Sequence, residues 1–229
     1  MTINPLPNII TIDGPSGAGK GTIAQNIANA LGFHILDSGS LYRLTALACQ
    51  NETISLADNS ALQAIALNLP VTFKPCESGL KIFLKDKDVT ETIREEAIGM
   101  LASKVAAITS VREALLARQR DFCEPPGLVA DGRDMGTTVF PNAPLKIYMT
   151  ASAEERAQRR FNQLKAKGIN ANIAALVKDL TLRDEQDVNR AISPLKPADD
   201  AIVLDTSHMS IKEVTQKVLD LAKLRLISA

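Results

Sequence analysis

A glycine-rich segment, GPSGAGKGT at residues 14–22, constrains the fold more than any other feature of the sequence. An apolar, β-branched run at residues 8–13 precedes it, and residues 20–31 carry apolar side chains at helical spacing. The first run predicts a buried parallel strand, and the second predicts an amphipathic helix. Glycines between a strand and a helix let successive main-chain N–H groups point inward, beside the positive end of the helix. The segment therefore predicts a phosphate-binding loop.

Two side chains of this loop suit a bound nucleotide. Lys20 can reach the β- and γ-phosphates, and the Thr22 hydroxyl can meet Mg²⁺ or a phosphate oxygen. The pattern departs from GxxxxGK[ST], because Gly21 follows the lysine and the hydroxyl comes one place later. The GKGT form resembles that of nucleoside monophosphate kinases. We expect ATP to bind to Gly14, Pro15, Ser16, Gly17, Ala18, Gly19, Lys20, Gly21 and Thr22.

Further apolar runs predict more strands of the same sheet. They lie at residues 128–131, 145–150 and 201–205, and amphipathic stretches lie at residues 93–108, 111–123, 153–167, 173–191 and 211–224. Strands that alternate with helices predict a parallel α/β sheet with right-handed crossovers. Two short β-like runs, at residues 71–74 and 81–84, interrupt this order and predict a small antiparallel insertion, with a decorated surface loop as the alternative.

Composition argues against several classes of protein. Lys+Arg and Asp+Glu number 26 each, and aromatic residues make up 3%, so we expect no nucleic-acid partner. No run approaches the roughly 18 apolar residues of a membrane span, and residues 1–7 lack the basic start of a signal peptide. The cysteines, Cys49, Cys76 and Cys123, form no CxxC pair. These features predict a cytoplasmic protein with reduced thiols and no membrane partner.

Asp131 ends one of the predicted strands. Carboxylates at strand ends of open α/β sheets face the ligand crevice, where Asp131 could order Mg²⁺ through water. A turn or capping aspartate is the alternative. The next residues favour the ligand site, because Arg133 and Asp134 lie between Gly132 and Gly136, and a surface ion pair would not need those glycines.

The second half of the chain carries two groups of arginines at helical spacing, Arg156, Arg159 and Arg160, and Arg183 and Arg190 with Asp187 between them. Solvated ion pairs are one explanation, worth a few tenths of a kcal/mol each. In a phosphoryl-transfer enzyme, such arginines stabilise charge on the transferred group. Earlier in the chain, Ser38 could start a helix that binds an acceptor phosphate together with Arg43. Ordinary capping with an exposed arginine is the alternative there.

These residues together resemble the bacterial cytidylate kinases over nearly the whole chain. The resemblance is carried by ITIDGPSGAGKGT, ILDSGSLYR, VREALLARQR, ADGRDMGT and RDEQDVNRAISPL. ADGRDMGT and the insertion at residues 71–89 discriminate, because adenylate kinases share the phosphate loop but continue their third strand with DG(F/Y)PR. The resemblance implies a P-loop NTPase-like, three-layer α/β fold with a five-stranded parallel sheet. It also implies a core at residues 1–37, 111–152 and 171–229, an acceptor-binding region with the insert at residues 38–110, and a short helical lid at residues 153–170.

The resemblance implies transfer of the γ-phosphoryl group of ATP to CMP or dCMP, with Mg²⁺, by a monomer acting in pyrimidine nucleotide metabolism. The implied CMP ligands are Ser38, Arg43, Ser103, Arg112, Arg133, Asp134, Asp187 and Arg190. The residues implied to assist transfer are Lys20, Arg133, Arg159, Arg183 and Arg190. Thr22, and Asp131 through water, would hold the metal.

Two other functions stay open. The acceptor could be UMP, AMP or shikimate, or the chain could be a nucleotide-binding switch rather than a kinase. The sequence contains no NKxD-type guanine-reading motif and no LSGGQ-like signature, and a switch would leave the arginine groups without a purpose.

Overall fold

The chain divides into two compact units in a computed structural model that describes residues 8–76 and 79–226. One unit combines residues 1–37 with residues 119–229, and the other consists of residues 38–118. Each unit has a buried apolar core of its own. The second unit is therefore an insertion in the sequence of the first.

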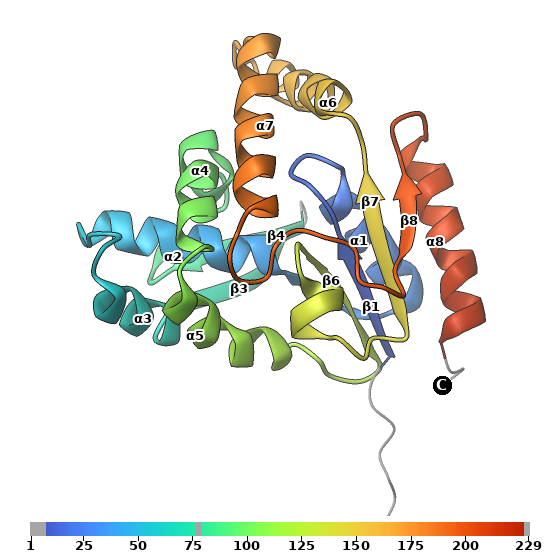
Figure 1. Cartoon of the computed structure of the whole chain (residues 1–229), viewed down its shortest axis with the longest axis horizontal. Helices are drawn as coiled ribbons and strands as arrows, with labels where there is room; N and C mark the ends of the chain where they lie inside the picture. The colour runs from blue at the N-terminus through green and yellow to red at the C-terminus, as the bar shows by residue number, and fades with distance from the viewer. Residues whose placement is uncertain (1–7, 77–78, 227–229) are drawn as a thin grey trace, which may run out of the picture. The chain divides into compact units, whose positions relative to one another are not determined.

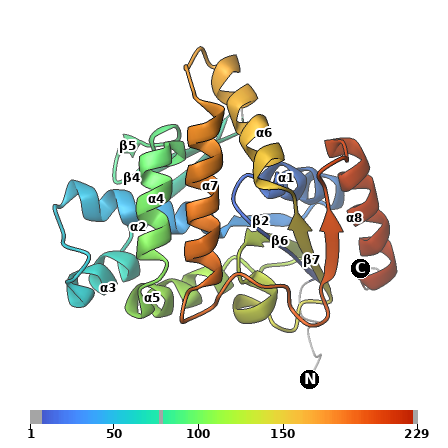
Figure 2. The same cartoon turned by 45° about the horizontal axis from the view of Figure 1, so that its top comes forward.

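Five parallel strands form the sheet of the first unit, in the order β2-β6-β1-β7-β8. Figure 1 labels β6, β1, β7 and β8, and Figure 2 labels β2. Their bounds are β1 (Asn8–Asp13), β2 (His34–Asp37), β6 (Gly127–Gly132), β7 (Leu145–Thr150) and β8 (Ile202–Asp205). The central strand, β1, pairs with β6 on one side and with β7 on the other. The predicted five-stranded parallel sheet is confirmed.

Helices α1 (Lys20–Leu31) and α8 (Ile211–Arg225) cover one face of this sheet. Side chains alternate between the two faces of a strand, and Ile10 and Ile12 of β1 join the core beneath these helices. The helices contribute Ile27 and Val218, both fully buried. The apolar residues at helical spacing after the glycine-rich loop are thus the inner face of α1.

The alternate residues of β1, Thr11 and Asp13, point to the opposite face. A one-turn π-helix labelled η2 (Met135–Val139) follows β6 and lies against that face, because its Gly136 approaches the Thr11 hydroxyl closely. Beyond β7, helices α6 (Ala153–Ala166) and α7 (Ile173–Val188) pack together through a small apolar cluster that includes Ala157, Leu176 and Leu180 (Figure 2).

The second unit is built from helices around a small antiparallel sheet. Its elements are α2 (Ser38–Asn51), α3 (Asn59–Leu67), β3 (Val71–Cys76), β4 (Gly79–Leu84), β5 (Lys87–Asp88), the 3-10 helix η1 (Thr92–Arg94), α4 (Glu96–Val105) and most of α5 (Thr109–Arg120). Its core includes Leu44, Ile82, Leu84 and Ile93. The predicted antiparallel insertion is confirmed and has three strands. No helix in the described part of either unit is long and apolar enough to cross a membrane.

Three local details differ from the sequence-based expectation. The amphipathic stretch at residues 93–108 is two helices, because Glu95 between them adopts an extended conformation, with φ −62° and ψ 147°. Strand β2 was not expected, and it is a four-residue strand at the edge of the sheet. Helix α3 was also not expected, although Asp58 caps it by accepting the Ala61 N–H.

The core beneath the sheet should account for much of the stability of the first unit. We expect Ile27→Ala, at a fully buried side chain, to lower the free energy of unfolding by about 2–5 kcal/mol. Ile211→Ala is the matched control, because that side chain on α8 is 56% exposed and its loss should change stability by less than about 0.5 kcal/mol. Urea denaturation followed by circular dichroism measures both. Equal losses in the two variants would contradict the described core.

Candidate active site

The phosphate-binding loop joins the central strand to α1. Gly14, Gly17 and Gly19 have φ values of 147°, 78° and 90°, a region that favours glycine. A side chain on Gly14 would also overlap the main-chain oxygen of Met149. At the start of α1, no side chain of the described residues caps the helix at Gly19, and its first turn contains no acidic residue. The N–H groups at this helix start are therefore available to an anion.

Lys20, the first residue of α1, is buried at the carboxyl ends of the strands. Its ammonium donates to the main-chain oxygen of Pro15 at 2.9 Å and lies 3.9 Å from the Asp131 carboxylate. Burial, together with nearby Arg133, lowers the pKa of Lys20 to about 8 despite the opposing effect of Asp131. Burial likewise raises the pKa of Asp131 to about 7, against the attraction of Lys20. Desolvation is thus the largest influence on both partners of this pair.

Asp131 and Thr22 offer the two kinds of oxygen ligand, a carboxylate and a hydroxyl, that suit Mg²⁺. Asp131 is next to last in β6 and nearly buried, and a side chain on Gly21 would lie 3.4 Å from its carboxylate. Thr22 is exposed in the first turn of α1. Mg²⁺ at phosphate-transfer sites commonly takes one or two protein oxygens and fills its remaining positions with phosphate oxygens and water. One carboxylate and one hydroxyl beside a phosphate loop meet that requirement.

A second group of buried charges centres on Asp187 of α7. Its carboxylate accepts from Arg133 at 2.8 Å and lies 3.1 Å from the guanidinium of Arg190. Burial opposes ionisation of Asp187, but Arg133 and Arg190 outweigh it and hold the pKa of this carboxyl below its usual value, with Arg183 adding to the effect. Asp187 therefore contacts two of the arginines that the sequence singled out, Arg133 and Arg190.

Helix α6 reaches the outer side of the phosphate loop with two arginines. Arg159 donates to the main-chain oxygens of Ala18, at 3.3 Å, and of Thr206, at 2.6 Å. Arg156 is buried, donates to the oxygen of Ser16 at 2.8 Å and pairs with Asp184 of α7 at 2.5 Å. Arg156 was not predicted as a site residue. Its contacts show that it joins the loop to both helices.

Four of the predicted site residues belong to the second unit, and two of them lie on α2. Ser38 is the buried first residue of this helix. Arg43 lies one turn further on and donates to the main-chain oxygens of Ile93, at 2.6 Å, and Glu95, at 3.3 Å. These two bonds place the guanidinium of Arg43 at the junction of η1 and α4.

The other two predicted residues of this unit are also buried. Ser103 lies on α4, and Arg112 lies on α5 and donates to the main-chain oxygen of Ala106 at 3.2 Å. The guanidinium of Arg112 lies 5.6 Å from the ring centroid of Tyr42, which neighbours Arg43 on α2. Such a cation–π contact orients an arginine without neutralising its charge. Tyr42 was not predicted, and only the spatial contact identifies it.

The first unit thus groups charged residues with the phosphate loop at the carboxyl ends of its strands, namely Asp131, Arg133, Arg159, Arg183, Asp187 and Arg190. Asp13, the last residue of the central strand, belongs to this group although it was not predicted. The argument that identified Asp131, a carboxylate at a strand end, applies equally to Asp13.

Moving a phosphoryl group requires a cradle of N–H groups for the donor phosphates and fixed positive charge around the transferred group. The first unit supplies both, so the fold and the site define a P-loop kinase.

Comparison with known proteins identifies the family. The family model for cytidylate kinase matches residues 10–224. The cytidylate kinase of Stutzerimonas stutzeri (strain A1501) is 56% identical over 219 residues, covering 95% of each chain. That of Colwellia psychrerythraea is 57% identical over 212 residues, covering 92% of this chain and 94% of the relative. The cytidylate kinase of Saccharophagus degradans is 57% identical over 218 residues, covering 95% of this chain and 97% of the relative. The chain belongs to the cytidylate kinase family.

The position of Lys20 in the loop predicts a large kinetic effect of its removal. We expect Lys20→Ala to lower kcat by about 10²–10³-fold, as for the loss of other preorganised charge-stabilising groups. Lys20→Met, which keeps more of the buried volume, should lose a similar factor. Lys223→Ala is the control, because that ammonium on α8 is exposed and pairs only with Asp220 in the described residues. Steady-state ADP formation and thermal melting report activity and folding, and near-normal turnover of a folded Lys20 variant would contradict the role.

Proposed function

We propose that the chain transfers the γ-phosphoryl group of ATP to CMP or dCMP, giving ADP and CDP or dCDP. One observation carries the proposal beyond family membership. Arg133, which donates to Asp187 at 2.8 Å, comes two residues after Asp131, whose carboxylate lies 3.9 Å from the ammonium of Lys20. A cation for the donor phosphates and an arginine suited to an acceptor phosphate therefore belong to one cluster of charge.

The reaction needs no general base, since the acceptor is already a phosphate anion. Positioning and electrostatic stabilisation then supply the catalysis. In this proposal Lys20 contacts the β- and γ-phosphates. Arg133, Arg183 and Arg190 neutralise charge around the transferred group, and Arg159 does so from α6. Because Arg133, Arg159 and Arg190 already have bonded partners, little reorganisation of these side chains is needed as charge develops.

Thr22 would hold Mg²⁺ directly, and Asp131 would do so through water. When bound, Mg²⁺ neutralises charge on the β- and γ-phosphate oxygens. The side chain of Asp131 is already held beside Lys20, so this carboxylate is in place before the metal binds.

We further propose that the acceptor nucleotide is bound by Ser38, Arg43, Ser103, Arg112, Arg133, Asp134, Asp187 and Arg190. Residues 38–110 would then be the acceptor-binding region, and residues 153–170, which include α6, would be a lid. Cys49 and Cys123 are free thiols, which supports the cytoplasm as the site of action. We propose that the protein acts as a monomer.

The acceptor panel tests this proposal directly. ADP formation from Mg·ATP should be fast with CMP and dCMP and slower by several orders of magnitude with AMP or shikimate, because polar groups of the pocket would be left unpaired. UMP reports how strictly the base is read. Fast turnover with AMP or shikimate alone would keep the phosphate-loop argument and overturn the acceptor assignment. ATP binding without turnover on any acceptor would favour a nucleotide-binding switch.

Arg43 offers a separate test of the acceptor side. We expect Arg43→Ala to raise KM for CMP by about tenfold or more, the size expected for loss of a charge-assisted hydrogen bond, and to leave KM for ATP nearly unchanged. Arg94→Ala is the matched control, because Arg94 is exposed in η1 and pairs with Glu91. Initial-rate kinetics with each substrate varied in turn separate the two constants. A change confined to KM for ATP would show that Arg43 does not bind the acceptor.

A further inference from the structure

Asp13 connects the phosphate loop, which follows it in the chain, with the turn after β6, to which its side chain is hydrogen-bonded. As the last residue of β1, it is followed directly by Gly14, the first residue of the phosphate loop. Its side chain is 5% exposed and leaves the strand toward the face on which η2 lies. One carboxylate oxygen accepts the N–H of Met135 at 2.8 Å, and the other accepts the N–H of Gly136 at 2.8 Å.

These two N–H groups open the π-helical turn and have no partner within it. The bonds inside the turn start later, where Thr138 and Val139 donate to the main-chain oxygen of Asp134. Met135 and Gly136 are buried, so an unpaired N–H at either position would be unfavourable. A carboxylate can accept from both N–H groups at once, whereas an amide offers only one oxygen.

The opposite end of the same segment is held by a charge of opposite sign. Lys146 of β7 donates to the main-chain oxygen of Pro141 at 2.5 Å and pairs with Asp200 at 2.8 Å. An acceptor at the N-terminal side and a cation at the C-terminal side match the polarity of a helical turn. The segment at residues 134–141 is therefore fastened to the sheet at both ends.

Gly136 shows how closely the turn lies on the sheet. A side chain there would lie 2.9 Å from the Thr11 hydroxyl, 3.2 Å from Lys146 and 3.3 Å from the Asp13 carboxylate. The turn has almost no room to move toward the sheet. Its two bonds to Asp13 oppose movement away from the sheet at the start of the turn, and Arg120 donates to the main-chain oxygens of Thr138 and Val139 at its end.

Arg133 and Asp134 immediately precede these bonds, and both are acceptor ligands in the proposed function. We propose that Asp13 is the positioning residue of the acceptor side, holding the turn after Arg133 and Asp134 through the main-chain N–H groups of Met135 and Gly136. This inference rests on the proposed function for its kinetic consequence. Its structural part, the fastening of the turn, is independent of that function.

The role requires the carboxylate form, in which both oxygens accept an N–H group. Burial raises the pKa of Asp13 to about 6, against the lowering effect of the two N–H groups. The charged and titratable groups that face it are Lys20 of α1, Asp131 of β6, Asp134 beside η2, and Tyr148 and Lys146 of β7. Lys20 favours the ionised form and Asp134 opposes it.

Asp13→Asn tests the role with almost no change in volume. The amide keeps one acceptor and turns a donor toward the second N–H group, so the turn should loosen. Hydrogen exchange of the segment at residues 133–140 should quicken by roughly tenfold or more while exchange in α8 stays the same, as expected for loss of one buried bond. With CMP varied, KM should rise by roughly tenfold, while KM for ATP should stay within about twofold.

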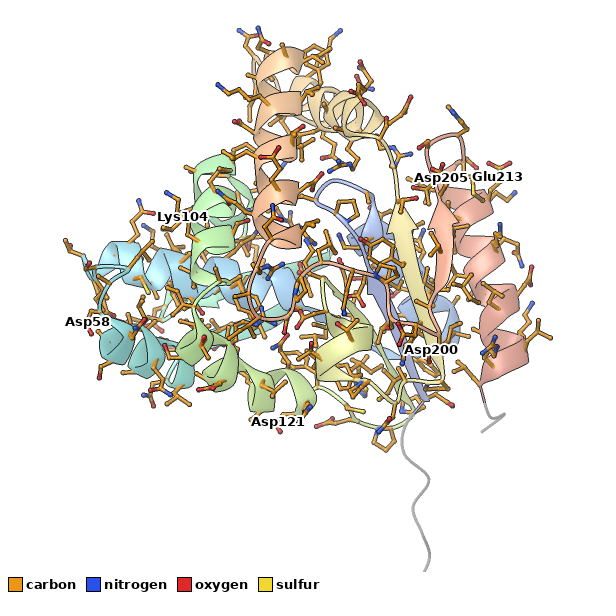
Figure 3. The ribbon with its side chains drawn as sticks, viewed as in Figure 1. Asp58, Lys104, Asp121, Asp200, Asp205 and Glu213 are labelled. Carbon is orange, nitrogen blue, oxygen red and sulfur yellow. The ribbon has the colours of Figure 1, made fainter. Side chains whose placement is uncertain are left out.

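Asp205→Asn is the matched control. Asp205 also ends a strand of this sheet and accepts an N–H, from Ser207 at 2.9 Å, but it is exposed at the end of β8 (Figure 3). This variant should match the unaltered protein in both kinetics and exchange. Asp13→Ala removes both acceptors. If this variant folds, its hydrogen exchange at residues 133–140 and its KM for CMP should rise more than in Asp13→Asn. If it does not fold, the result for Asp13→Asn decides the question.

Three results would overturn the inference. Unchanged exchange at residues 133–140 in Asp13→Asn would show that the carboxylate does not hold the turn. A rise in KM for ATP equal to that for CMP would place the effect on the phosphate loop instead. A lower melting temperature with both constants unchanged would leave Asp13 a purely structural residue. If the unaltered protein does not use CMP at all, the proposed function fails, and hydrogen exchange still decides whether Asp13 fastens the turn.

Discussion

Everything at the site depends on the parallel pairing of β1 with β6 on one side and β7 on the other. This pairing sets the end of β1 level with the end of β6, and the chain turns there into the phosphate loop, which brings Lys20 to Asp131. A slip of one residue would turn Ile10 and Ile12 out of the core. The packing that stabilises the first unit therefore also decides where its charges lie.

Those buried charges differ in how far burial is compensated. Three carboxylates (Asp131, Asp13 and Asp187) act on Lys20, and two cations (Lys20 and Arg133) act on Asp131, but burial outweighs them and moves the pKa of both groups toward neutrality. Asp187 is buried to a similar degree, but several arginines surround it and keep it ionised. Charges that are paired before substrate arrives do not need to be reoriented during transfer, and such preorganisation is where electrostatic catalysis gains most. The arginines held by Asp187 thus have partners before any substrate binds, whereas in the proposed function a bound phosphate completes the charge balance of Lys20.

The sequence predicted well the elements that depend on a local motif or on a regular spacing of apolar residues. The phosphate loop, α1 and four of the five strands follow from glycine spacing and apolar runs, and the fifth strand was implied only by the family resemblance. The sequence analysis did not predict strand β2, because this strand is short and pairs with β6 alone. The hydrogen bonds that hold the turn after β6 could not be predicted for a different reason: their acceptor, the carboxylate of Asp13, lies 122 positions before Met135 in the chain. Arg156 was noticed as part of a helical pattern, but nothing local distinguishes a buried arginine that binds a loop carbonyl from a solvated one.

The strand order also has a consequence for synthesis of the protein. Strands β1 and β2 do not pair with each other, and the partner that both require, β6, begins only at Gly127. At about 5–20 residues per second on the ribosome, the apolar strand that ends at Asp13 emerges on the order of 10 s before its partner exists. The inserted unit, with a core of its own, is complete before then. During translation the insertion can fold first, while β1 remains an unpaired apolar strand of the kind that chaperones bind.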